Sequence, residues 1–204
     1  MTGAASITKA LAIQGWMTPS ELAFLQAIVF TLPERARMVE VGSWKGRSTV
    51  AICGALADLS DARLFVVDTF RGDPSILGDM SATGVETEFR SNTAPFSHML
   101  EVVVDDSVAA AGQFADGFLD CVFIDANHEH EHVLADIRSW APKLKPDGLF
   151  CGHDYGKFGL TLAVHQCFGR NVQHWESIWF TRSPCTRHLR FALEAAARRA
   201  IGRL

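Results

Sequence analysis

The chain has 204 residues, of which 48% are hydrophobic and 21% are charged, and its formal net charge is −4. These values are ordinary for a globular protein and predict one domain with a substantial core, without a charge that would favour a nucleic-acid partner. The sequence contains no apolar run of about 18 residues and no N-terminal signal pattern. Its five cysteines form no paired motif, so we expect reduced thiols in a cytoplasmic protein without a transmembrane segment.

The N-terminal region, residues 1–34, is expected to be helical and to cover the ligand end of the sheet. A helix is predicted from Thr18 to about Phe30, because a hydroxyl cap followed by proline is a common helix start. Trp16 and Met17 precede this helix. They either contribute to a lid over a ligand or simply pack.

A glycine-containing loop follows the first predicted strand, residues 38–41. Gly42 ends the strand, Gly46 follows four residues later, and a helix is predicted over residues 48–56. Strand, glycine turn and helix form the first unit of nucleotide-binding α/β folds, in which the helix N-terminus attracts anionic groups. A dinucleotide loop would have the spacing G-x-G-x-x-G, whereas here Glu40 occupies the first glycine position and the second loop glycine comes one residue late. The alternative is an ordinary strand-to-helix turn.

Polar residues also follow the next two predicted strands. The second strand, residues 64–68, ends in Asp68, which follows Gly46 by 22 residues. This spacing is close to the roughly 20 residues expected for a ribose-binding acid, although an acid here can also cap the next element. The third strand, residues 102–104, is followed by Asp106 and Ser107, which either contact a ligand or cap a helix that extends to about Phe114.

The fourth and fifth predicted strands end in a second group of polar side chains. The fourth, residues 118–125, ends in Asp125, with His128 three residues later; the fifth, residues 149–152, is followed by His153 and Asp154. Neighbouring parallel strands end at the same edge of a sheet, so these side chains should converge. Carboxylates with an imidazole suit Mg²⁺ or Mn²⁺, and the predicted metal ligands are Asp125, His153 and Asp154.

The remaining chain completes an α/β pattern. A helix is expected over residues 161–168 and a hairpin over 172–175 and 178–181, which predicts a Rossmann-like doubly wound sheet, mainly parallel, with a C-terminal antiparallel hairpin. Residues 1–186 form one domain in this reading, with an irregular insertion at 70–97. Residues 187–204 form a basic helix that either contacts a second subunit of a homo-oligomer or an anionic membrane, or is solvated.

Five motifs together resemble the class I methyltransferases that use S-adenosylmethionine, and they occur in the family's order and spacing. They are V-E-V-G-S-W-K-G-R-S-T (39–49), V-D-T-F (67–70), I-D-A-N-H (124–128), L-K-P-D-G (144–148) and G-H-D-Y (152–155). The resemblance covers roughly residues 15–182. It is specific to small-molecule O-methyltransferases that include metal-dependent macrolide-sugar enzymes and are related to catechol O-methyltransferase. It departs from the catechol type at the metal site, where that type has Asp-Asn and this chain has His153-Asp154.

The resemblance implies a seven-stranded class I methyltransferase fold and an S-adenosylmethionine site in which Glu40 faces the ligand's ammonium group. The expected cofactor-binding residues are Glu40, Gly42, Ser43, Trp44, Gly46, Ser48, Asp68, Thr69, Asp106, Ser107 and Asp125.

We therefore predict O-methylation of a small-molecule hydroxyl of sugar or other natural-product type. His128 is expected to act as the general base, assisted by Asp125, because imidazole titrates near neutral pH. The alternative for His128 is a helix-start histidine with only local hydrogen bonds. Alternatives for the protein are an NAD(P)-dependent oxidoreductase, an iron oxygenase that uses His128, His153 and Asp154, and a non-catalytic binding module.

Overall fold

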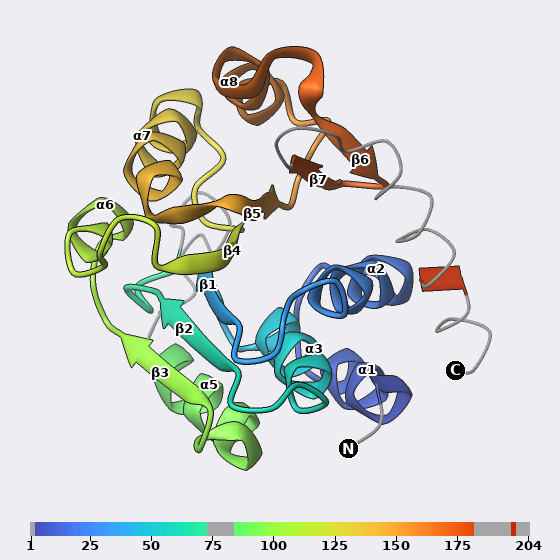
Figure 1. The fold of residues 1–204 in the computed structure, drawn as a ribbon. Helices are drawn as coiled ribbons and strands as arrows, with labels where there is room; N and C mark the ends of the chain where they lie inside the picture. The colour runs from blue at the N-terminus through green and yellow to red at the C-terminus, as the bar shows by residue number, and fades with distance from the viewer. Residues whose placement is uncertain (1–2, 73–83, 182–196, 199–204) are drawn as a thin grey trace.

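The computed structural model describes residues 3–72, 84–181 and 197–198, and its centre is a seven-stranded sheet of order β3-β2-β1-β4-β5-β7-β6 (Figure 1). The strands are β1 (Arg37–Val41), β2 (Arg63–Val67), β3 (Leu100–Val103), β4 (Leu119–Ile124), β5 (Leu144–Gly152), β6 (Gln173–Trp175) and β7 (Ile178–Thr181). The first five strands pair in parallel, whereas β7 is antiparallel to both β5 and β6. This topology confirms the predicted fold class.

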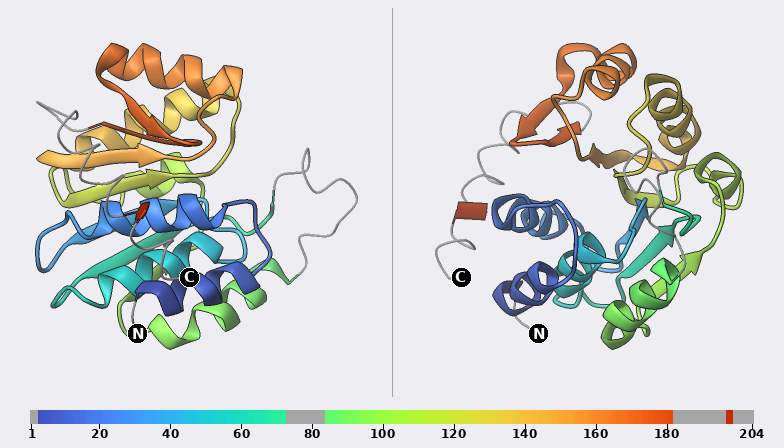
Figure 2. Two further views of the ribbon diagram at one scale, coloured as in Figure 1. Left: turned by 90° about the vertical axis from the view of Figure 1, so that its right-hand side faces the viewer. Right: turned by 180° about the vertical axis from the view of Figure 1, so that it is seen from behind.

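Helices cover both faces of the sheet (Figure 2). One layer contains α1 (Gly3–Ala12), α2 (Pro19–Val29), α3 (Arg47–Leu56) and α5 (Val85–Thr93), and the other contains α6 (Ser107–Ala111), α7 (His130–Trp140) and α8 (Phe158–Phe168). Short 3₁₀ turns lie at Ala94–Phe96, Ala141–Lys143 and Gly169–Asn171. Each layer packs its own apolar core against the sheet, because successive side chains of a strand point to opposite faces.

After β1 the chain first adds strands on one side of β1 and then crosses over to add strands on its other side. The order places β2 and β3 on one side of β1, and β4 and β5 on the other. Such a reversal opens a crevice at the carboxyl ends of the strands, where open α/β sheets bind ligands. The ligand site is therefore expected at the ends of β1, β2 and β4.

Most predicted elements are present, with shifted boundaries. The start of α2 carries the expected cap: the Thr18 hydroxyl accepts a hydrogen bond from Glu21 N at 3.2 Å, and the Glu21 carboxylate accepts one from Thr18 N at 2.8 Å. Strand β5 begins at Leu144 and not at 149, with a register shift against β4 between Leu119 and Cys121. The sequence did not predict this start because Pro146 and Gly148, which are uncommon inside strands, lie within β5.

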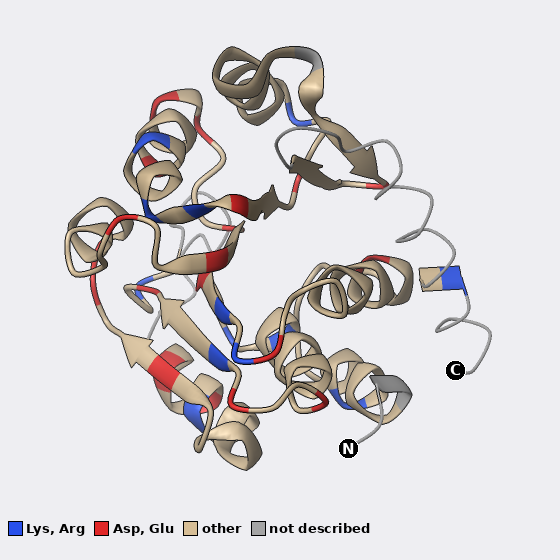
Figure 3. Ribbon diagram, in the orientation of Figure 1, with Lys and Arg blue, Asp and Glu red and all other residues tan. Residues whose placement is uncertain are grey.

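Several expectations concern segments that the structure does not describe. The structure does not describe residues 73–83 of the insertion, nor residues 187–196 and 199–204 of the predicted basic helix. The division into a domain and a tail therefore stays a prediction. Within the described part, charged segments of both signs are interspersed along the ribbon (Figure 3). None of the helices described is long and apolar enough to cross a membrane.

Candidate active site

The strand register places the predicted site residues in one row. Val41 of β1 is level with Val67 of β2 and Ile124 of β4, and Ile124 is level with Gly152 of β5. The next residue of each strand is therefore at the same edge of the sheet. A cavity of about 400 Å³ opens there. The expected cofactor residues that line it are Gly42, Ser43, Trp44, Ser48, Asp68, Thr69, Asp106, Ser107 and Asp125.

The loop after β1 crosses the end of β4 at very short range. Gly42 has a φ of +84°, and a Cβ built on it would lie 2.3 Å from the carbonyl oxygen of Asp125. Only glycine fits this position, because both the backbone conformation and the space exclude a side chain. The close approach brings the loop directly beside the Asp125 region.

Asp68 holds this loop in place. One carboxylate oxygen accepts hydrogen bonds from Ser43 N at 2.7 Å and from Trp44 N at 2.8 Å, and the other accepts one from Phe70 N at 2.7 Å. The Ser43 hydroxyl also donates to the first of these oxygens, at 3.1 Å, so three of the four bonds fall on Oδ2. Among the described residues Oδ1 accepts only from Phe70 N, so its second lone pair is the acceptor position that can bind a ribose hydroxyl. Its predicted ribose contact stays a prediction.

Two expected cofactor residues lie behind the cavity wall. Glu40 is buried and accepts a hydrogen bond from the Thr49 hydroxyl at 2.6 Å, while its second oxygen is buried without a hydrogen-bond partner. Burial raises the pKa of Glu40 to about 8, although the nearby hydroxyls of Ser48 and Thr49 oppose this. Gly46 is the N-cap of α3. Neither residue lines the cavity, so their ligand contacts also stay predictions.

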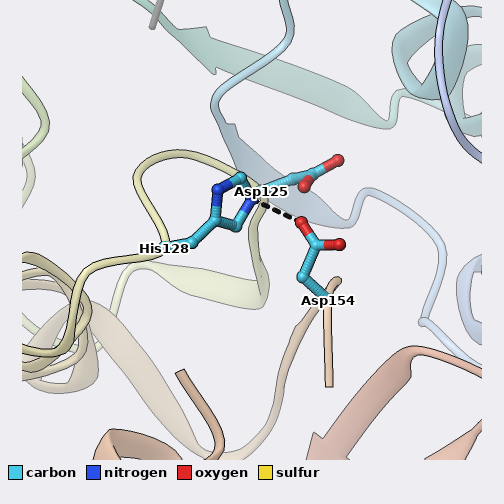
Figure 4. Close-up of side chains that lie close together, drawn as sticks. All are labelled: Asp125, His128 and Asp154. Carbon is cyan, nitrogen blue, oxygen red and sulfur yellow. Dashed lines mark ion pairs between the residues drawn. The ribbon is translucent and has the colours of Figure 1, made fainter. Parts of the chain in front are cut away.

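Asp125, His128 and Asp154 converge at the β4–β5 end of the cavity (Figure 4). Each offers one ligand atom, and these atoms all lie within 4.8 Å of one another. Nε2 of His128 forms an ion pair with the Asp154 carboxylate, and Lys157 Nζ lies 3.0 Å from the same carboxylate. Asp154 has a φ of +63°, which is uncommon outside glycine and concentrates at functional sites.

His153 lies between this group and Glu21 and is part of a buried ion pair. Its Nε2 lies 3.2 Å from Glu21 Oε1, and its Nδ1 lies 3.4 Å from Asp125 Oδ1 and 3.6 Å from Asp154 Oδ1. Burial alone would lower the pKa of His153, but the three carboxylates outweigh it and raise the pKa to about 12. The group whose ligand atoms lie within 4.8 Å of one another contains His128 with Asp125 and Asp154, and His153 lies beside it in the ion pair with Glu21. The predicted metal role of His153 stays a prediction.

The ion pair also keeps its acids charged. Burial raises the pKa of Glu21, but hydrogen bonds from His153, Ser177 and Thr18 lower it to about 2. Burial likewise acts on Asp154, yet His128 and His153 hold the pKa of that carboxyl well below its usual range. The result is a protonated His153 behind the Asp154 carboxylate, which lines the cavity.

The opposite end of the cavity lies between the end of β3 and α7. Asp106 is the N-cap of α6, with its carboxylate accepting from Val108 N at 3.0 Å and Ala109 N at 3.3 Å. The capping role considered from sequence is thus present. Sequence reasoning did not identify Asp136, which lines the cavity here. It occupies the same face of α7 as Trp140. An acid among the apolar residues of one helix face is unusual, and this pattern could have indicated a functional residue.

The N-terminal segment covers the loop after β1. The rings of Trp16 and Trp44 stack with centroids 4.5 Å apart. The Arg47 guanidinium donates to the carbonyl oxygens of Ile13 at 2.7 Å and Met17 at 2.9 Å. Trp16 and Met17 both line the cavity, as the lid interpretation requires.

A family whose description is "Methyltransferase domain" has a sequence model that matches residues 39–155. The chain belongs to this methyltransferase family. The matched span is more than half of the chain and runs from within β1 to the residue after Asp154, so it contains the strand ends that form the cavity. The enzyme class and the family resemblance expected from the sequence are confirmed. A search of curated proteins gives no match.

Solved structures share the fold of this methyltransferase. They include cofactor-bound Rv0187 from MTB (16% identity, TM-score 0.62, covering 89% of both chains) and an O-methyltransferase from Bacillus cereus in complex with SAH (16%, 0.63, 88% of this chain and 91% of that one). The calicheamicin methyltransferase CalS11 is also similar (13%, 0.62, 80% and 77%). At these identities the likeness shows the fold.

Proposed function

We propose that this methyltransferase transfers the methyl group of S-adenosylmethionine to a hydroxyl of a small-molecule acceptor, of sugar or other natural-product type. One observation carries the proposal: a single cavity joins the loop held by Asp68 to the group formed by Asp125, His128 and Asp154. The bound SAH of the Bacillus cereus neighbour and the calicheamicin methyltransferase activity in the name of CalS11 support it.

Residues at the two ends of this cavity have separate tasks in the reaction. The loop and Asp68 hold the methyl donor, and the acceptor oxygen bonds to the methyl carbon as the carbon–sulfur bond breaks and leaves a neutral thioether. Positioning supplies much of the rate, because in-line geometry is required. The acceptor must also lose its hydroxyl proton, and a base near the transferred methyl group assists that loss.

His128 is the proposed base, with Asp154 as its partner. Asp154 contacts Nε2 of His128, so in the neutral ring Nδ1 is the nitrogen left to take the acceptor's proton and later release it to water (Figure 4). The negative charge of Asp154 stabilises the imidazolium that forms. Asp154 itself stays ionised because His128 and His153 lower its pKa although burial raises it.

The same three side chains fit a divalent cation. Asp125, His128 and Asp154 present two carboxylates and one imidazole within 4.8 Å, a donor set suited to Mn²⁺ or Mg²⁺. A cation there would act as a Lewis acid and make the acceptor hydroxyl easier to deprotonate. Nε2 of His128 would then have to exchange Asp154 for the metal, so the two arrangements are distinguishable by chelation.

The proposed setting is cytoplasmic. Cys53, Cys121 and Cys151 are buried free thiols, and the sulfur atoms of Cys121 and Cys151 lie 3.8 Å apart without a disulfide bond. Unlinked neighbouring thiols suit a reducing compartment.

The test is formation of S-adenosylhomocysteine from S-adenosylmethionine over a panel of nucleotide sugars and polyhydroxylated aromatics, with and without EDTA. We expect acceptor-dependent turnover that Asp154→Asn lowers at least about 100-fold, as for loss of a general-base partner. Glu176→Gln, an exposed acid outside the cavity, is the matched control and should keep full activity. Activity that survives Asp154→Asn contradicts the assigned site, and activity that survives chelation excludes the metal.

A further inference from the structure

The turn between β6 and β7 is joined to the start of α2 by three consecutive side chains, residues 175–177. Each is hydrogen-bonded to a different side chain there, and the pairs are Trp175 with Ser20, Glu176 with Thr18, and Ser177 with Glu21. The first two bonds are 3.1 and 3.0 Å long and tie the turn to the helix outside the cavity. Ser177 differs, because its hydroxyl also reaches His153, which lines the cavity.

Ser177 bridges Glu21 and His153 with a defined direction of its hydrogen bonds. Its hydroxyl is bonded to Glu21 Oε1 and lies 3.1 Å from His153 Nε2. A charged carboxylate can only accept, so the hydroxyl proton goes to Glu21. The Ser177 oxygen therefore accepts from the Nε2–H of His153, and this edge of the ring is held by both residues.

The backbone of Ser177 is also fixed beside the site. Its carbonyl oxygen accepts from Tyr155 N at 2.9 Å, and Trp179 of β7 is level with Gly152 of β5. Tyr155 directly follows Asp154 in the chain. Ser177 is therefore attached to the end of β5 at two points, by its backbone to Tyr155 and by its hydroxyl to His153.

The other edge of the His153 ring faces two acids of the cavity. Its Nδ1 lies 3.4 Å from Asp125 Oδ1 and 3.6 Å from Asp154 Oδ1. Because Ser177 holds Nε2, the ring cannot turn without losing that bond, and Nδ1 stays between the two carboxylates. Asp154 in turn contacts Nε2 of His128. A continuous path of contacts thus connects Ser177, through His153 and Asp154, with the proposed base.

We propose that Ser177 is a positioning residue for methyl transfer, which fixes the His153 ring so that Asp154 stays aligned with His128. This inference rests on the proposed function and adds a residue from the β6–β7 turn that touches neither cofactor nor acceptor. A displacement of about 1 Å in a catalytic group can lower a rate about 100-fold, so one hydroxyl outside the cavity is enough to matter.

Crystal structures of wild type and Ser177→Ala test the alignment without any acceptor. The other two pairs should keep the turn in place, whereas the Asp154 carboxylate should move by about 0.5–1 Å relative to His128 Nε2 or occupy two orientations. Ser60→Ala is the matched control, because it removes a hydroxyl that also donates to a glutamate, Glu34, at an exposed place outside the cavity. Asp154 should not move in the control. An unmoved Asp154 in Ser177→Ala overturns the inference.

Kinetics separate positioning from a general structural role. S-adenosylhomocysteine formation is measured over the panel of nucleotide sugars and polyhydroxylated aromatics. Ser177→Ala should lower kcat roughly 10- to 100-fold with nearly unchanged KM and S-adenosylhomocysteine affinity, and Ser177→Thr, which keeps the hydroxyl, should restore most of it. In a His128→Ala background Ser177→Ala should have little further effect, because the path ends at His128.

The outcomes distinguish this inference from the proposed function. An unchanged kcat in Ser177→Ala, or the same fold-loss with and without His128, overturns the positioning role and leaves the proposed function standing. If wild-type protein turns over no compound of the panel, the proposed function fails, and the crystal structures still decide whether Ser177 aligns Asp154. If Ser177→Ala does not fold, Ser177→Cys, which keeps the shape but donates only weakly, takes its place.

Discussion

The buried pair of Glu21 and His153 should contribute strongly to stability, and Glu21→Gln tests this. The variant keeps the shape of the side chain and leaves the Thr18 cap in place, but it removes the negative charge 3.2 Å from His153 Nε2. His153 keeps Asp125 and Asp154 at 3.4 and 3.6 Å, so it remains partly compensated. The expected loss is therefore at the lower end of the 3–5 kcal/mol typical of breaking a buried ion pair, about 3 kcal/mol.

The pKa values give the same magnitude and a sign for its pH dependence. The pKa of Glu21 lies at about 2, against 4.5 for the free side chain, and this difference corresponds to about 3 kcal/mol. A lowered carboxyl pKa contributes stability that is complete above 4.5 and is lost as the pH falls towards 2. The raised pKa of His153, about 12 against 6.5, contributes fully below 6.5 and progressively less at higher pH. The pair is therefore most stabilising between about pH 4.5 and 6.5.

Urea denaturation of wild type and Glu21→Gln at pH 6 and pH 3 measures this contribution. At pH 6 we expect the variant to be about 3 kcal/mol less stable, or about 6–12 °C lower in Tm, with a smaller difference at pH 3. Glu176→Gln is the control, because Glu176 is exposed and only accepts from the Thr18 hydroxyl. Glu176→Gln should lower the free energy of unfolding by less than about 0.5 kcal/mol. A loss below about 1 kcal/mol in Glu21→Gln, or one independent of pH, refutes the reasoning.

Three further predictions concern catalysis, the loop and the tail. His128→Ala should lower kcat roughly 10²–10⁴-fold with nearly unchanged S-adenosylhomocysteine affinity, and the rising limb of the pH–rate profile should disappear; parallel loss of affinity would make His128 structural. Gly42→Ala should lower the free energy of unfolding by about 2–4 kcal/mol and abolish cofactor binding, because the added Cβ meets the Asp125 carbonyl. The control Gly117→Ala, at a φ of +68° but with open space around it, should lower the free energy of unfolding by only about 1 kcal/mol. Equal losses in the two variants would show that crowding at Gly42 contributes nothing. If the tail joins two subunits, removal of residues 187–204 should halve the molecular mass measured by light scattering. An unchanged mass, together with no binding of the full-length protein to anionic liposomes, would rule out both the subunit contact and the membrane contact.

The parts of the site that sequence could predict are those specified by local pattern. Gly42, Asp68 and Asp125 each end a short apolar strand, and parallel register alone brings strand ends to one edge. The fold class follows from the same alternation of strands and helices. Predictions that depended on strand ends therefore agreed with the structure to within a few residues.

Side-chain direction at the site could not be predicted, because it depends on distant parts of the chain. His153 turns towards Glu21, which belongs to α2, and towards Ser177 in the β6–β7 turn. No local pattern near His153 indicates these partners, and the sequence alone therefore does not predict that His153 joins the buried ion pair. The sequence places Asp136 on the apolar face of α7, but no local pattern shows that this part of α7 lines the cavity.

The two described residues of the tail give its prediction a structural starting point. Ala197 is buried in the core layer that contains α2, and the Arg198 guanidinium lies 5.2 Å from the centre of the Trp175 ring. This pair lies beside α2 (Figure 1). A cation over an aromatic ring is a favourable contact, so this part of the tail packs on the chain's own body.

Calorimetric titration of the wild-type protein with S-adenosylhomocysteine, and in parallel with NAD, tests the central claim most directly. The account predicts that S-adenosylhomocysteine binds and that NAD does not. It also predicts that Asp68→Ala weakens S-adenosylhomocysteine binding by about 1.5–3 kcal/mol or more, because the variant loses the support of the loop as well as the predicted ribose contact. Asp58→Ala, an exposed acid outside the cavity, should bind as wild type does. Binding of NAD without S-adenosylhomocysteine, or equal affinity in Asp68→Ala and wild type, would contradict the account.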